Sequence, residues 1–161
     1  MALGAALILA LASYLPARRG TAPVAGDAAG KPNVLIILVD ALRYDHLSLH
    51  GYARETSPRI DAFGRAGICF ERAYAQAPWT KPSTASILTG LYPSSHGVSL
   101  MASGVPASAP LLAEMMQAAG YRTALLTANS FITPMFGFGR GVDYFYASSP
   151  PRFIQMMLGH L

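Results

Sequence analysis

The stretch that decides the fold spans residues 75–97 and reads AQAPWTKPSTASILTGLYPSSHG. A proline disfavours helix at the residue before it, so Pro82 predicts that Thr80 and Lys81 lie in an extended segment or a turn. Pro82 itself suits the first turn of a helix, and the apolar residues after it continue that helix until Gly90 ends it. The stretch therefore predicts a threonine hydroxyl near the positive end of a helix dipole, where a tetrahedral oxyanion binds well.

The same stretch carries a sequence signature. Its run Thr80-x-Pro-Ser-Thr-Ala, with Leu-Thr-Gly-Leu-Tyr-Pro at 88–93 and His-Gly at 96–97, resembles the nucleophile signature of the sulfatase family, within the alkaline-phosphatase-like superfamily. The resemblance runs from about residue 31 to residue 146. It implies an α/β fold, a three-layer αβα sandwich with a mostly parallel sheet. This chain would be the N-terminal portion, because proteins of this family are several hundred residues long.

The resemblance places the N-terminal part of a sulfatase-like catalytic domain at residues 32–161. Residues 2–14 are apolar, too short for a bilayer span of about 20 residues but typical of a signal-peptide core. We therefore expect residues 1–15 to be a signal peptide or membrane anchor, and the protein to be exported (periplasmic or extracellular) or membrane-anchored. A buried cytosolic helix is the alternative. Residues 16–31, rich in Ala, Gly and Pro, predict a linker.

Residues 33–39, NVLIILV, form an apolar and β-branched run that ends at Asp40. Such a run predicts a central strand of a parallel sheet, and ligands of open α/β sheets bind beyond the carboxyl ends of the strands. The resemblance implies that Asp40 binds a catalytic divalent metal, calcium or zinc, together with Thr80. The alternative is that Asp40 caps the next helix. The family often has a second aspartate where this chain has Ala41, which leaves the identity and number of metals open.

Four further elements are predicted. Ser57 and Pro58 start a helix that ends before Gly67, and residues 68–74 form a second strand with Cys69 buried. The other two elements are a helix over residues 109–119 and a strand over residues 121–128.

Three polar side chains outside the main motif are ambiguous. Asn129, at the end of the predicted strand 121–128, either donates its amide to an ester oxygen or forms a turn. His46 and His50 have a zinc-like spacing, but no third ligand lies nearby, so we expect them to be structural.

Composition excludes several classes of function. The formal net charge is +4, the basic residues are scattered, and no stripe of basic and aromatic residues is present, so nucleic-acid binding is not expected. A single cysteine excludes an internal disulfide and a cysteine metal cluster. At 52% hydrophobic and 12% charged residues, the chain is not of the disordered class.

Displacement at the sulfur or phosphorus of an ester needs a nucleophile, a metal and positive charge around the non-bridging oxygens. Thr80 can supply the nucleophile and Asp40 can bind the metal. Lys81, Thr84 and Asn129 are candidates to contact the substrate. Sulfatases oxidise a cysteine or serine at the nucleophile position to an aldehyde, whereas a threonine would give a ketone. Thr80 must therefore attack as an unmodified hydroxyl. This chemistry favours a phosphate ester as substrate, whereas the family resemblance implies a sulfate ester.

Three functions remain after this reasoning. The first is a metal-dependent hydrolase of sulfate or phosphate esters of a small molecule, glycan or lipid. The second is a membrane-associated transferase of the phosphoethanolamine type. The third is a binding protein that keeps the fold without turnover. The resemblance also implies that the remaining metal ligands come from later strands, so we expect this chain alone to be inactive.

Overall fold

The computed structural model describes residues 30–148. The chain divides into two compact units. We call Asn33–Ala75 the small unit, and the other described residues, 30–32 and 76–148, the core unit. The segment predicted as a signal peptide or anchor and almost all of the predicted linker lie outside the described residues, so both remain predictions.

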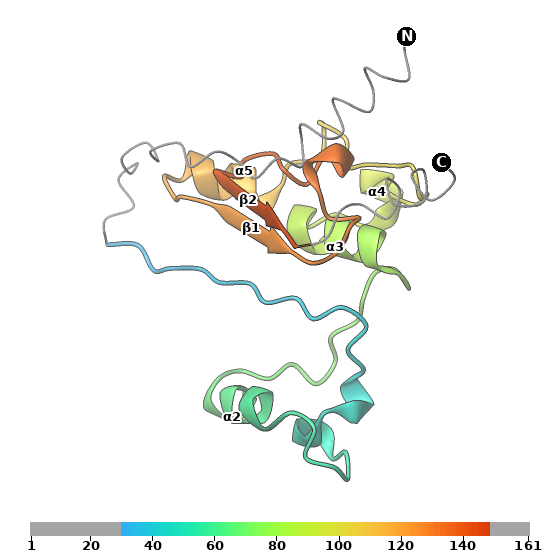
Figure 1. The fold of residues 1–161 in the computed structure, drawn as a ribbon, viewed down its shortest axis with the longest axis vertical. Coiled ribbons are helices and arrows are strands. Elements are labelled where there is room, and N and C mark those ends of the chain that lie inside the picture. Colours follow the sequence, from blue (N-terminus) through green and yellow to red (C-terminus); the bar gives the residue numbers. More distant parts are fainter. Residues whose placement is uncertain (1–29, 149–161) are drawn as a thin grey trace. The chain divides into compact units, whose positions relative to one another are not determined.

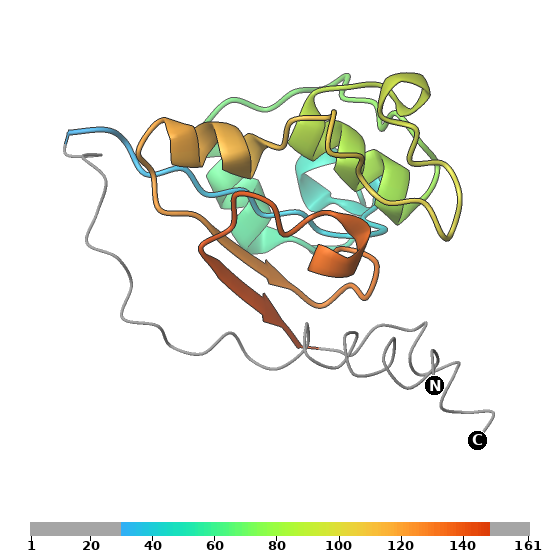
Figure 2. The ribbon, with the colours of Figure 1, turned by 90° about the horizontal axis from the view of Figure 1, so that it is seen from above.

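The core unit is an α/β assembly with a parallel sheet, as predicted (Figure 1). Strands β1 (Ala124–Thr127) and β2 (Tyr144–Ala147) pair in parallel, with Ala124 opposite Tyr144 and Thr127 opposite Ala147. The helices are α3 (Thr80–Thr89), α4 (Pro93–His96) and α5 (Leu112–Ala118), and a 3₁₀ turn, η3 (Pro134–Phe136), lies on the connection between the strands. Figure 2 shows the two strands side by side.

A buried apolar cluster holds the core unit together. It gathers side chains from α3, from the loops on either side of α4, from the start of α5 and from the β1–β2 connection: Ala85, Val98, Val105, Ala109, Leu111, Ile132, Phe136 and Phe138. Burial of such side chains is the dominant stabilising contribution to folding. The connection between the strands is thus part of the core rather than a surface loop.

Two polar side chains fix the end of that connection that leads into β2. The guanidinium of Arg140 donates hydrogen bonds to the carbonyl oxygens of Ala109 at 2.7 Å and Pro106 at 3.1 Å, and lies 3.4 Å from the carboxylate of Glu114. The carboxylate of Asp143 accepts hydrogen bonds from the backbone N–H of Thr123 and from the Gln117 amide, both at 2.8 Å. These contacts tie β1, β2 and α5 to one another.

Helix α3 begins earlier than predicted. Thr80 is its first residue and Trp79 its N-cap, so Thr80 and Lys81 are helical rather than extended. The first N–H groups of a helix have no intrahelical partner, so Pro82, which has no N–H, is tolerated in the first turn without the loss of a hydrogen bond. The predicted end is confirmed, because Gly90 caps the helix in the left-handed conformation and its N–H donates to the Ser86 carbonyl.

The small unit contains one α-helix and two short 3₁₀ turns. Helix α2 (Pro58–Ala66) starts after Ser57 and ends before Gly67, as predicted. Ser57 does not cap the helix through its side chain; its hydroxyl donates instead to the buried carboxylate of Asp61 at 2.6 Å. The 3₁₀ turns are η1 (Tyr44–His46) and η2 (Ser48–His50).

Two predicted strands are absent from the small unit. Residues 33–39 and 68–74 are not strands in the structure, and their apolar side chains are exposed: Leu35 by 82% and Ile68 by 85%. Cys69, predicted to be buried, is exposed as well. A strand forms only where a neighbour pairs with its backbone groups, and β1 and β2 are the only paired strands among residues 30–148. A run of apolar and β-branched residues therefore does not suffice to predict a strand.

The remaining predictions were correct in type but wrong in extent. Helix α5 and strand β1 are each shorter than the predicted ranges 109–119 and 121–128. Strand β2 was not predicted. Within the described residues, no helix is long and apolar enough to cross a bilayer.

Candidate functional site

Thr80 occupies the first position of α3, at the positive end of a ten-residue helix, and is half-buried. Trp79 before it has an extended backbone, with φ −145° and ψ 163°, so the chain turns sharply into the helix at the hydroxyl-bearing residue. The N-terminal N–H groups of a helix and its dipole both favour an anion. The position suits a nucleophile that attacks the centre of an anionic ester.

Lys81 does not face the solvent. Its side chain is completely buried, and its ammonium donates a 2.5 Å hydrogen bond to the carbonyl oxygen of Met101. The ammonium also lies 4.0 Å from the ring centroid of Phe136 and 5.8 Å from those of Trp79 and Phe131. Burial lowers the pKa of the Lys81 amine below its ordinary value. The positive charge expected to grip the substrate is thus held inside the core unit.

These aromatic rings join two segments that carry predicted site residues. Trp79 and Phe131 pack edge to face at a centroid distance of 6.3 Å, and Phe131 contacts Phe136 at 6.2 Å. Trp79 directly precedes Thr80, and Phe131 lies two residues after Asn129. The structure therefore brings the segment of the proposed nucleophile together with the loop that follows β1. No sequence pattern predicted this cluster, because its rings come from distant parts of the chain.

Asn129 follows the carboxyl end of β1, as predicted, and makes a tight turn there. Its side-chain oxygen accepts a hydrogen bond from the N–H of Phe131 at 2.9 Å, and its own N–H donates to the hydroxyl of Thr127 at 3.0 Å. A side-chain oxygen bonded two residues on is the pattern of an Asx turn. The turn-forming alternative for Asn129 is thus observed, and its amide nitrogen remains the group proposed for substrate contact.

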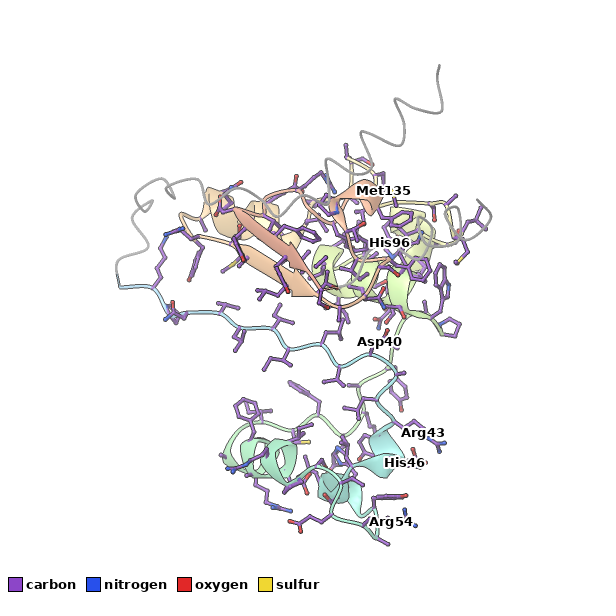
Figure 3. All side chains as sticks on the ribbon, viewed as in Figure 1. Asp40, Arg43, His46, Arg54, His96 and Met135 are labelled. Carbon is purple, nitrogen blue, oxygen red and sulfur yellow. The ribbon has the colours of Figure 1, made fainter. Side chains whose placement is uncertain are left out.

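Thr84 and a Ser–His pair lie deeper along α3. Thr84 is 4% exposed, so it belongs to the buried side of the helix. Ser86 and His96 are also buried, with 3.0 Å between the hydroxyl oxygen and Nε2 of the imidazole. Figure 3 labels His96 among the side chains of the core unit. The N–H of Val98 donates to Nδ1 of His96, so in the neutral ring the proton is on Nε2, the nitrogen that faces Ser86, and Nε2 has no lone pair to accept the Ser86 proton. His96 is therefore no base for Ser86, and the pair is structural.

Asp40 belongs to the small unit, and the structure does not place it relative to Thr80. The residue after it, Ala41, has a φ of 56°, a left-handed conformation that is uncommon for residues other than glycine. Strain of this kind is often found at functional sites. The strained position thus directly follows the carboxylate that the family resemblance implies as a metal ligand.

The described residues do not supply a complete metal site. Residues 30–148 contain no group of three or more His, Cys, Asp or Glu side chains placed to hold an ion. Zinc takes about four ligands and calcium about six to eight, so one carboxylate with one hydroxyl is too small a donor set. His46 and His50 are stacked against Tyr52 and Tyr44, at centroid distances of 4.7 and 3.7 Å, which agrees with the structural role expected for them.

Comparisons with known proteins agree with the signature around Thr80. The model of the family Sulfatase matches residues 32–156. The chain is 31% identical to arylsulfatase A of Bos taurus over 145 residues, which cover 76% of this chain and 27% of that protein. It is 31% identical to N-acetylgalactosamine-6-O-sulfatase of Bacteroides thetaiotaomicron over 106 residues, 63% of this chain and 21% of that protein. An arylsulfatase of Clostridium perfringens is 42% identical over 67 residues, 42% of this chain and 14% of that protein.

The chain thus spans 27% or less of the length of these three relatives. No solved structure matches it significantly. The family match nevertheless covers most of the chain and includes α3 with Thr80, the helix that carries the sequence signature. By its sequence and its parallel α/β architecture, the chain belongs to the sulfatase family.

Proposed function

We propose that this protein is a hydrolase of sulfate esters in which the hydroxyl of Thr80 is the nucleophile. The observation that carries the proposal is the position of Thr80, half-buried at the first residue of α3 and inside the region matched by the sulfatase family. The relatives named above are sulfatases, so the comparisons do not favour a phosphoethanolamine-type transferase or a protein without turnover.

The reaction has two steps in this proposal. The Thr80 oxygen attacks the sulfur, a new O–S bond forms, and the bond from sulfur to the leaving alcohol breaks as that alcohol takes up the proton that the Thr80 hydroxyl gives up. Water then cleaves the threonine ester, which releases sulfate and restores the hydroxyl. The N-terminal end of α3 would stabilise the charge on the non-bridging oxygens in both steps.

Asp40 is proposed as one ligand of a divalent metal, calcium or zinc. A bound metal of this kind would act as a Lewis acid and lower the pKa of a hydroxyl that it contacts. Since the described residues supply too few donors, further ligands would have to come from outside them. Asp40→Asn is expected to weaken metal binding by the full-length protein, as measured by calorimetry.

The proposed substrate contacts are the least constrained part of the site. Thr84 and Lys81 are buried, so neither side chain reaches solvent in this structure, while Asn129 is half-buried beside the aromatic cluster. We propose an aryl, glycan or lipid sulfate as substrate, on the strength of relatives named arylsulfatase and N-acetylgalactosamine-6-O-sulfatase. Export or membrane anchoring through residues 1–15 remains part of the proposal.

A phosphate ester is the second candidate, and one residue favours it. Threonine cannot be oxidised to the aldehyde that sulfatases use, so Thr80 would attack as an alcohol, as nucleophiles of phosphate-ester enzymes do. The same two steps then take place at phosphorus. Nothing else in the described residues distinguishes the two esters.

The test is a paired assay of the full-length protein with p-nitrophenyl sulfate and p-nitrophenyl phosphate. Thr80→Ala should abolish turnover of whichever ester is hydrolysed, and mass spectrometry should find a sulfate or phosphate adduct on the peptide with Thr80 in the unchanged protein. Thr89→Ala is the matched control, because Thr89 is a buried threonine at the other end of α3, bonded to the Ala85 carbonyl at 2.6 Å. Equal rates for Thr80→Ala and the unchanged protein would exclude Thr80 as the nucleophile.

A further inference from the structure

The buried ammonium of Lys81 has an environment without a counter-ion. Among the described residues, no carboxylate forms an ion pair with it. Its partners are one carbonyl oxygen, that of Met101, and the rings of Trp79, Phe131 and Phe136, which we call the aromatic cage. Taking a charge out of water is costly, and one hydrogen bond with cation–π contacts offsets that cost only in part. Because this desolvation is unfavourable, we expect Lys81 to have a role other than filling space in the core.

Lys31 provides an internal comparison, because these are the chain's two lysines. The ammonium of Lys31 also donates to a backbone carbonyl, that of Ala119 at 2.6 Å, and lies 5.7 Å from the ring of Tyr121. Lys31 is exposed, whereas Lys81 is completely buried. The two lysines share their kinds of partner and differ in burial, so burial is the property that needs explaining.

The contacts of Lys81 join three segments next to the proposed nucleophile. Lys81 lies in the first turn of α3, Met101 belongs to the loop after α4, and Phe131 and Phe136 belong to the β1–β2 connection. An uncharged side chain of similar length would fill the cage but would leave the Met101 carbonyl without its donor. The ammonium thus sets the orientation of the first helical turn, and Thr80 is its first residue.

We propose that Lys81 is a positioning residue, whose caged ammonium fixes the first turn of α3 and with it the hydroxyl of Thr80. The inference rests on the proposed function of Thr80 and replaces direct substrate binding by Lys81. A misplacement of about 1 Å at a reacting group costs about 100-fold in rate, so loss of the ammonium should lower kcat.

The kinetic test compares Lys81→Met, Lys81→Arg and Lys31→Met in the full-length protein. Lys81→Met should lower kcat about 10- to 100-fold with KM within about twofold and with an unfolding temperature close to that of the unchanged protein. Lys81→Arg should recover a large part of kcat, because a guanidinium also donates to carbonyls and stacks on rings. Lys31→Met should have no effect. A raised KM at constant kcat, or a lowered unfolding temperature at constant kcat, would overturn the proposal.

A second readout does not depend on turnover. Trp79 is the chain's only tryptophan, so its fluorescence reports on the cage alone. Lys81→Met should shift that emission and Lys31→Met should not, and an amine-acetylating reagent should label Lys31 much faster than Lys81. If the unchanged protein hydrolyses neither ester, the proposed function fails while these measurements still test the cage. Unshifted emission in Lys81→Met, or equal labelling of both lysines, would overturn the cage itself.

Discussion

The core unit and the small unit treat apolar side chains in opposite ways. In the core unit, eight apolar side chains form one buried cluster. In the small unit, the buried side chains are the polar Ser57 and Asp61, while Leu35 and Phe63 are each 82% exposed. Both units are rich in apolar residues, so composition does not explain the difference. Burial requires several apolar side chains that pack around one another, and in the described residues only the core unit has such a buried apolar cluster.

The largest expected effect tests whether the two units serve one reaction. Asp40→Asn in the small unit and Thr80→Ala in the core unit should each lower kcat/KM at least about a thousandfold in the full-length protein. Because groups that act as a unit are strongly non-additive, the double variant should be no slower than the slower single variant. Steady-state kinetics on p-nitrophenyl sulfate and phosphate measures all three.

Additive losses in that cycle would mean that Asp40 and Thr80 act independently. Thr89→Ala combined with Asp40→Asn is the control pair, since Thr89 lies on the same helix as Thr80 but at its other end. That pair should show only the effect of Asp40→Asn.

The second prediction concerns stability. Phe138→Ala removes a side chain that is 1% exposed in the core unit and should lower the free energy of unfolding by about 3–5 kcal/mol. Phe63→Ala, at an 82% exposed position in the small unit, should change it by no more than about 0.5 kcal/mol. Denaturant unfolding compares the two variants. Similar losses would mean that Phe63 is packed in solution, and the contrast between the units would not hold.

The third prediction uses pH, because the core unit also buries a titratable ring. Burial lowers the pKa of His96, against a smaller opposing effect from the backbone of Pro82. Below the ordinary histidine pKa of about 6.5 the unfolded chain therefore takes up a proton that the folded chain resists. As the pH is lowered through this range, the free energy of unfolding should therefore decrease. The contribution of this ring is at most about 1.4 kcal/mol per pH unit.

His96→Gln should flatten that pH dependence, measured by denaturant unfolding at a series of pH values below about 7, near the ordinary histidine pKa. An unchanged slope in His96→Gln would assign the acid sensitivity to other groups. The absolute stability of the variant does not enter the test.

The smallest expected effects are changes in the free energy of unfolding at two backbone positions, and these two changes have opposite signs. Gly90 has a φ of 70°, and no neighbouring atom lies within 4 Å of the place that a Cβ would take, so Gly90→Ala should lose about 1 kcal/mol purely from its left-handed backbone. Ala41 has a φ of 56°, so Ala41→Gly should raise the free energy of unfolding by about 0.5–1 kcal/mol, because the relief of backbone strain exceeds the extra conformational entropy of glycine in the unfolded chain. Thermal unfolding measures both, and equal signs would contradict the left-handed geometry at one of them.

Local signals in the sequence predicted the start of α2 and the end of α3. Ser57 and Pro58 mark the start of α2, and Gly90 marks the end of α3, since these residues act on the backbone next to them. Helix α3 starts before the residue that Pro82 indicated, because a proline in the first turn is compatible with helix before it. The position of Thr80 at a helix N-terminus was nevertheless predictable.

Features that depend on distant partners were not predictable. Residues 33–39 have a strong strand pattern but no paired neighbour within residues 30–148, while the unpredicted four-residue strand β2 pairs with β1. The aromatic cage escaped prediction for the same reason, since Phe131 and Phe136 are far from Lys81 in sequence. A pattern records which side chains a segment offers, and the fold decides which of them find partners.

The parallel pairing of β1 with β2 also sets an order of events during synthesis. Tyr144 lies opposite Ala124, so β1 emerges from the ribosome well before the strand that completes it. The helix with Thr80 forms its backbone hydrogen bonds from nearby residues, but a ten-residue helix is marginal in water and needs the packing of the buried cluster, whose last members are Phe136 and Phe138. All members of that cluster precede Tyr144, so the proposed nucleophile helix can pack once the β1–β2 connection has emerged, before β2 completes the sheet.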